Sequence, residues 1–214
     1  GNSIDGTVNA YAENSAVVDV WGQVTNLALS NNTITTTKSG QKGVYIVEVT
    51  GDDSNIVVSD NAISTLDATG VETRADSSAV TGNSIHLATA TAWSYGVKVY
   101  CTADIESAIV SGNSIRDYDI GIGVEVYATD TISSAIVTGN FITASGLSPS
   151  KARVGIRLDG GTGSTHFVDG IVSDNHIEAS TFWDSFVEVR TGKSLVAGAG
   201  VIPGGTTGQI LAKA

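Results

Sequence analysis

The sequence predicts an all-β chain that winds as a right-handed, single-stranded parallel β-helix of about seven coils over residues 1–192. Two patterns predict this fold: a corner motif built around asparagine recurs seven times, and short runs of alternating aliphatic residues lie between the corners. The composition agrees, with 41% hydrophobic but only 6% aromatic residues and no methionine. Small aliphatic residues suit a repetitive strand core.

Each corner pairs an asparagine with an isoleucine two residues later, at intervals of 22 to 35 residues, as expected for a constant core with variable loops. The residue before each asparagine is Gly, Asn or Asp, which tolerate a left-handed backbone. We therefore expect a sharp turn, with the asparagines stacked about 4.8 Å apart and hydrogen-bonded in a ladder. The seven pairs are Asn2/Ile4, Asn32/Ile34, Asn61/Ile63, Asn83/Ile85, Asn113/Ile115, Asn140/Ile142 and Asn175/Ile177.

A second strand precedes the corner in most coils and begins, in most cases, with glycine followed by alternating aliphatic residues, as in Gly96-Val97-Lys98-Val99 and Gly123-Val124-Glu125-Val126. Stacking these runs on their first residues predicts an outward column that alternates in charge. Tyr45 is a candidate to open the column, although its strand admits more than one register. The column reads Glu72, Lys98, Glu125, Arg157, Glu188.

Several classes of protein and site are disfavoured by the residue counts. With 11 basic and 22 acidic side chains the formal charge is −11, so nucleic acid is an unsuitable partner. No apolar run reaches the roughly 20 residues of a membrane span. The single cysteine, Cys101, is expected to face the core. We expect no metal and no cofactor, because His86, His166 and His176 fall on different coils without ligand spacing.

The segments IVSGNSI, IVTGNFI and IVSDNHI, which end at Ile115, Ile142 and Ile177, resemble the repeats of right-handed parallel β-helix proteins. That group includes pectate lyases, polysaccharide epimerases and phage tailspikes. The likeness covers about residues 1–192 and is specific for fold, because one fold serves many functions. Since Gly1-Asn2-Ser3-Ile4 already matches the repeat, we expect the chain to begin within a coil.

Residues 193–214 are predicted to form a glycine-rich, extended tail or connector. The string Pro203-Gly204-Gly205-Thr206-Thr207-Gly208-Gln209-Ile210-Leu211-Ala212-Lys213 resembles a connector found in bacteriophage tail fibres and neck appendages. In such relatives the β-helix is homotrimeric and recognises or degrades host surface glycans. The resemblance implies an extracellular virion component that contacts itself, bacterial polysaccharide and other tail proteins.

One outward position of the repeat is unexpectedly apolar and suggests a surface for self-association. It lies just before the inward valine of the corner motif, and we expect it to pack around a threefold axis. A bulge that turns both aliphatic residues inward is the alternative. The candidate interface residues are Val57, Ile109, Ile136 and Ile171, in line with Ala28 and Ala79.

A glycan surface is predicted where aromatic side chains gather, because pyranose rings present apolar C–H faces ringed by hydroxyl groups. Tyr100 and Tyr127 are expected at equivalent outward positions on consecutive coils, with Asp159 next in that column. Trp93, Tyr95 and Trp183 lie in the loops leading to the same face. The alternative is that these aromatic residues only stabilise neighbouring strands.

Two further functions remain open from the sequence. A polysaccharide depolymerase, either hydrolase or lyase, would need two carboxylates, for which Glu125 and Asp159 are candidates. Pairing of Glu125 with Lys98 and Arg157 argues against it as a general acid, because neighbouring cations favour the ionised form. The other alternative is an extracellular adhesin without a phage connection, which would be monomeric.

Overall fold

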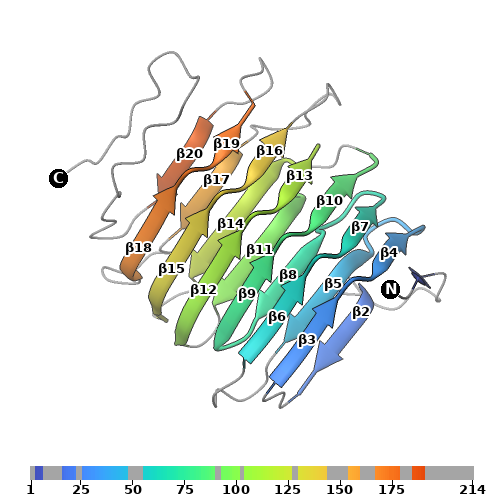
Figure 1. Cartoon of the computed structure of the whole chain (residues 1–214), viewed down its shortest axis with the longest axis horizontal. Helices are drawn as coiled ribbons and strands as arrows, with labels where there is room; N and C mark the ends of the chain where they lie inside the picture. Colours follow the sequence, from blue (N-terminus) through green and yellow to red (C-terminus); the bar gives the residue numbers. More distant parts are fainter. Residues whose placement is uncertain are drawn as a thin grey trace.

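The computed structural model describes residues 3–6, 16–22, 26–47, 55–89, 93–101, 104–126, 130–143, 154–159, 167–178 and 185–190. Within these residues the chain forms β-strands and no α-helix. The strands stack in three parallel sheets along the molecule (Figure 1), which confirms the predicted right-handed parallel β-helix. The predicted tail, residues 193–214, lies outside the described residues.

Every full coil contributes one strand to each sheet, running from sheet C through the asparagine corner into sheet A and then into sheet B. Sheet A contains β1 (Ser3–Gly6), β4 (Thr33–Thr36), β7 (Ala62–Thr65), β10 (Ser84–Leu87), β13 (Ser114–Arg116), β16 (Phe141–Thr143) and β19 (His176–Ile177). Sheet B contains β2 (Ala16–Trp21), β5 (Lys42–Val47), β8 (Val71–Arg74), β11 (Tyr95–Cys101), β14 (Ile120–Val126), β17 (Val154–Asp159) and β20 (Ser185–Arg190). Sheet C contains β3 (Asn26–Ser30), β6 (Asn55–Ser59), β9 (Ser77–Thr81), β12 (Ile105–Ser111), β15 (Ile132–Thr138) and β18 (Phe167–Ser173).

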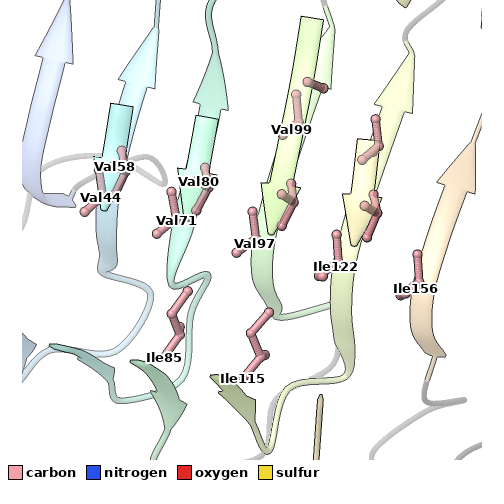
Figure 2. Packing of buried hydrophobic residues seen from close by; sticks show 14 of the residues in the cluster. Val44, Val58, Val71, Val80, Ile85, Val97, Val99, Ile115, Ile122 and Ile156 are labelled. Carbon is pink, nitrogen blue, oxygen red and sulfur yellow. The ribbon is translucent and has the colours of Figure 1, made fainter. Parts of the chain in front are cut away.

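Aliphatic side chains from all three sheets fill the interior of the stack. In sheet B, one fully buried inward column consists of Val44, Val71, Val97, Ile122 and Ile156. Figure 2 shows this column beside valines of sheet C and isoleucines of sheet A. Each such side chain contributes about 1.5–3 kcal/mol on burial. Cys101 ends β11 opposite the buried Val126, but its own side chain lies outside the described residues.

The predicted asparagine ladder is present from Asn32 to Asn175. From Asn32 to Asn140, each Nδ2 donates to the Oδ1 of the next asparagine at 2.8–3.1 Å, and the backbone N–H of the same residue donates to that oxygen at 2.9–3.0 Å. All six side chains are buried, so these bonds satisfy groups that water does not reach. Asn2 lies outside the described residues.

The residue before each ladder asparagine adopts the left-handed backbone that the motif predicts. Its φ is 58° at Asn31, 55° at Asp60 and Asp174, 66° at Gly82, and 64° at Gly112 and Gly139. Glycine, asparagine and aspartate reach this region at low cost. The sharp corner therefore follows directly from the residue types at this position.

A second constraint acts in sheet B, where glycines pack against the neighbouring coil. A Cβ at Gly43, Gly70, Gly96 or Gly121 would lie 2.5–2.6 Å from the carbonyl oxygen of the next glycine in the column, and would also meet an isoleucine of sheet A. Neither obstacle is the end of a flexible side chain. Only glycine fits this column, and the column therefore fixes the register of sheet B.

The prediction that Gly96 stacks on Gly123, made from the first residues of their two runs, is wrong. β11 pairs with β14 so that Tyr95 lies opposite Ile120 and Val97 opposite Ile122, which puts Gly121 in the glycine column. The physical reason is that the carbonyl of the next coil leaves no space for a side chain at position 121. Gly123 lies two residues further on, where a Cβ would meet the Tyr95 ring.

This shift interrupts the predicted charge column. Glu72 lies opposite Lys98, and Arg157 opposite Glu188, as expected, but Gly123 stands between Lys98 and Arg157. Glu125 lies instead in the neighbouring column. Tyr45 lies opposite Glu72 in the same column, but it does not open the column, because Asp19 of β2 precedes it.

We predict that Asn113→Ala lowers the free energy of unfolding by about 3 kcal/mol or more, because it leaves several buried amide and carbonyl groups without partners. Chemical denaturation monitored by circular dichroism measures the change. The neighbouring Ser114→Ala, at an exposed position, serves as control and should change stability by less than about 0.5 kcal/mol. Equal effects of the two substitutions would contradict a stabilising role for the ladder.

Candidate functional site

The outer face of sheet B carries most of the aromatic and charged side chains that lie close together in the described chain. We define this sheet B face by the side chains that contact one another on it, which are Trp21, Lys42, Tyr45, Glu72, Arg74, Trp93, Tyr95, Lys98, Tyr100, Glu125 and Arg157. They come from β2, β5, β8, β11, β14 and β17 and from the turn before β11.

The alternation of side chains along sheet B breaks at Gly43 and Gly96, and this break adds side chains to the face. Val97 points into the core, yet Tyr95, two residues earlier, packs outside it with Ile120 and Val154 in a separate buried cluster. Simple alternation would place Tyr95 and Val97 on the same side. Lys42 stands before Gly43 as Tyr95 stands before Gly96, and it likewise lies outside, against Glu72.

One end of the sheet B face is built around the carboxylate of Glu72. Lys42 Nζ lies 2.7 Å from its Oε2, and Arg74 donates to its Oε1 from Nε at 3.0 Å and from Nη2 at 2.7 Å. The Lys42 ammonium also lies 3.8 Å from the centre of the Tyr45 ring, which Trp21 meets edge to face at 5.6 Å. Five side chains thus form one connected cluster.

Burial and ion pairing act in opposite directions on this cluster. Burial alone would raise the pKa of the Glu72 carboxyl, but Lys42 and Arg74 outweigh it and hold the pKa below 4.5. Burial also lowers the pKa of the Lys42 ammonium, although its attraction to Glu72 opposes the change. Glu72 is therefore a structural anion.

The middle of the face is held together by Tyr95, Lys98 and Glu125. The Tyr95 hydroxyl donates to Glu125 Oε1 at 2.6 Å, and Lys98 Nζ lies 3.2 Å from Oε2 of the same carboxylate. Burial, followed by the charge of Glu125, raises the pKa of Tyr95, so this hydroxyl stays a proton donor. The expected pairing of Glu125 with Lys98 is confirmed, although it runs diagonally between columns.

Tyr100 lies between the cluster around Glu72 and the cluster around Glu125. Arg74 Cζ is 4.8 Å, and Lys98 Nζ 4.4 Å, from the centre of its ring. Both are within the range of cation–π attraction. Tyr100 therefore lies against one cation from the Glu72 cluster and one from the Glu125 cluster. The positions of these side chains depend on the stacking of β8, β11 and β14.

Trp93 presents its indole at the edge of the face from a strained backbone. Its φ is 65°, which is rare for a bulky side chain, and its backbone N–H donates to Asp119 Oδ2 at 2.9 Å. The side chain is 53% exposed, with the Arg157 guanidinium 5.7 Å from a ring centre. Trp21, at 57% exposed, offers a second open aromatic surface on β2.

The structure describes three of the five aromatic residues predicted for the glycan surface. Trp93, Tyr95 and Tyr100 do gather on one face, whereas Tyr127 and Trp183 lie outside the described residues. Tyr100 and Asp159 do lie in one column, but the residue between them is Glu125 and not Tyr127, because Tyr100 lies opposite Glu125 and Glu125 opposite Asp159. The two candidate catalytic carboxylates are thus direct neighbours on adjacent strands.

Sequence reasoning missed Trp21, Lys42 and Arg74 as members of the face. The position of Lys42, directly before a column glycine, was a usable signal, since Tyr95 shares it. No equivalent signal marks Trp21, because its contact with Tyr45 depends on the register of β2 and β5.

The outer face of sheet C carries the predicted apolar column. Ala28, Val57, Ala79, Ile109, Ile136 and Ile171 lie opposite one another in register. The bulge alternative is wrong, because the strands pair residue by residue and only the following valines, such as Val110 and Val137, are buried in the core. Ile171 is 46% exposed, and the other members are half-buried or exposed.

Within the described ranges, no three His, Cys, Asp or Glu side chains come together as a metal site, and no helix is long and apolar enough to cross a membrane. The sheet B face instead combines aromatic surfaces with closely spaced donors and acceptors. This combination suits the hydroxyl groups and apolar ring faces of sugars. Comparisons with family models, curated proteins and solved structures each find no match to the chain.

We predict that Glu72→Gln lowers stability at pH 7 by about 1–3 kcal/mol, because Lys42 and Arg74 lose their shared anion. Since the folded-state pKa of Glu72 is lowered, its contribution is fully present above pH 4.5 and disappears as the pH falls through the folded-state value. Denaturation of both proteins across this range should therefore show the difference shrinking in acid. A difference that stays constant with pH would contradict the ionic origin.

Proposed function

We propose that the chain is a segment of a bacteriophage tail fibre or tailspike, exposed on the virion, that binds polysaccharide on the bacterial surface through the sheet B face. The fold and the resemblance of residues 203–213 to a phage connector support the phage assignment. Other tail proteins are the expected partners at its ends.

The observation that carries glycan binding is the continuity of the sheet B face across successive coils. Trp21 on β2, Trp93 in the turn before β11 and Tyr100 on β11 offer exposed or partly exposed aromatic surfaces. Arg74 and Lys98 lie beside the Tyr100 ring, and the buried rings of Tyr45 and Tyr95 support this surface through contacts with Trp21 and Lys98. Neighbouring strands are about 4.8 Å apart, so a polymer lying along the coil axis meets new donors and acceptors at each strand. A single small ligand would not need so long a surface.

We predict that Trp93→Ala and Tyr100→Ala each weaken binding to host polysaccharide about three- to tenfold, because each removes an aromatic surface. A bacterial glycan array identifies the ligand, and titration calorimetry measures the loss. Phe141→Ala is the matched control, since Phe141 is an exposed aromatic residue on sheet A, where it stacks on His176. Binding that Trp93→Ala and Tyr100→Ala leave intact would refute this location of the site.

We further propose that the chain assembles as a homotrimer through the outer face of sheet C. The apolar column from Val57 to Ile171 supports this surface, because exposed aliphatic side chains in register on a polar molecule favour burial against another chain. Ser and Thr flank the column on the corner side, and Asn, Ser and Asp flank it on the other, at matching register positions. Among the described residues, Asp169 is therefore the only charged residue in the two columns that flank the apolar column.

We predict that the double substitution Ile136→Asp and Ile171→Asp converts the trimer into monomers, because six carboxylates would be buried at the interface. Light scattering after size-exclusion chromatography measures the mass. Ser84→Asp together with Ser114→Asp, on exposed positions of sheet A, is the control and should leave a trimer. An intact trimer in the Ile136/Ile171 variant would overturn the proposed interface.

Polysaccharide cleavage is the second candidate function, and the register of β14 and β17 favours it by placing Glu125 directly opposite Asp159. Glycoside hydrolysis uses two carboxylates that flank the scissile bond. We predict for this candidate that bound polysaccharide gains new reducing or unsaturated ends with time, and that Glu125→Gln and Asp159→Asn abolish the gain. Binding without any new ends would exclude cleavage of that polymer.

A further inference from the structure

The charged residues of the described chain are distributed unevenly among its strands and turns. Sheet B strands carry five of the seven described basic residues, namely Lys42, Arg74, Lys98, Arg157 and Arg190, and an equal number of acidic ones, namely Asp19, Glu72, Glu125, Asp159 and Glu188. The other described segments carry only Lys38 and Arg116 as basic residues, against twelve Asp and Glu. In a chain of formal charge −11, the sheet B strands are thus the part with balanced charge.

The ion pairs that link β5, β8, β11 and β14 hold more cations than carboxylates. Lys42 and Arg74 share the single carboxylate of Glu72, and Lys98 pairs with Glu125. These printed ion pairs therefore join three cations to two carboxylates, and two of the cations, Arg74 and Lys98, lie against the Tyr100 ring. A negative charge arriving here would be attracted, whereas the acidic remainder of the molecule would repel it.

Arg74 and Lys98 also keep hydrogen-bond donors for an incoming acceptor. Arg74 uses Nε and Nη2 toward Glu72, and of the five guanidinium donors those on Nη1 meet no acceptor among the described residues. Lys98 has three donors and one carboxylate contact, at 3.2 Å. Both side chains are partly exposed, with 24% and 18% of their surface open.

We infer that the sheet B face binds an acidic polysaccharide. The carboxylates of its sugars bind Arg74 and Lys98, which both lie against the Tyr100 ring. This inference rests on the proposed glycan function and names the substrate class of the same site. Charge-assisted hydrogen bonds from the two cations supply the selectivity, while Tyr100 and the exposed tryptophans pack against sugar rings. A neutral polymer would make the second kind of contact alone.

Alginate, a polymer of uronic acids, provides a direct test, because its carboxyl groups can be reduced chemically to primary alcohols without breaking the chain. Affinity electrophoresis and titration calorimetry with alginate and with carboxyl-reduced alginate compare the two forms on the full chain. We expect binding to alginate that is about tenfold tighter than to the reduced polymer and that weakens as salt is added.

Arg74→Gln and Lys98→Gln should each remove about tenfold of the affinity for alginate and change binding to the reduced polymer little. Arg116→Gln, which removes the same charge from sheet A, is the matched control and should bind like the unaltered chain. Circular dichroism and denaturation of each variant confirm that the coils remain folded. Retained alginate affinity in both sheet B variants would overturn the inference.

Failure of the inference and failure of the proposed function give different results. Equal binding to alginate and its reduced form, or binding only to neutral chains on the glycan array, overturns the acidic preference while leaving glycan recognition in place. Binding to no polysaccharide on the array or in solution overturns both.

Discussion

The stack of buried asparagine amides is the interaction on which the rest of the structure depends. Each side chain from Asn32 to Asn140 donates to the next asparagine's oxygen, and that oxygen also receives the backbone N–H of the donating residue. One oxygen therefore fixes both a side chain and a corner of the main chain. Because an unsatisfied buried amide is costly, the coils can stack in only one way. Residues dozens of places apart become neighbours at every strand.

The surface chemistry follows from this stacking. The Lys42, Glu72 and Arg74 cluster joins β5 to β8, and the Tyr95, Lys98 and Glu125 cluster joins β11 to β14, so neither exists within a single coil. Sheet C differs only in what its outward positions hold, which is an aliphatic column between polar ones. Two faces of one repetitive frame thus offer different surfaces, one polar and aromatic and one apolar.

The corners, the inward valines and the sheet C column could be predicted from the sequence, because each depends on a local pattern that repeats with every asparagine. The register of β14 could not, since Gly121 and Gly123 both precede an aliphatic residue and the contacts that distinguish them, with the Gly155 carbonyl and Ile142 at one and with Tyr95 at the other, come from other strands. The sequence placed Tyr95 in a loop leading to this face. Its position within β11, outward and two residues before the inward Val97, escaped prediction because the alternation of side chains breaks at Gly96. The local repeat predicts neighbours along a strand better than pairs across strands.

The asparagine ladder has a direction, since from Asn32 to Asn140 each side-chain Nδ2 donates to the asparagine oxygen of the later coil and no asparagine oxygen of the series accepts from a later asparagine. Parallel amide dipoles of this kind polarise one another, so inner rungs gain from their position in the series. Every inner rung also presents the same donor and the same acceptor to its neighbours. Length variation in this architecture should therefore occur in whole turns of the solenoid, each inserted unit entering in one orientation with its own amide.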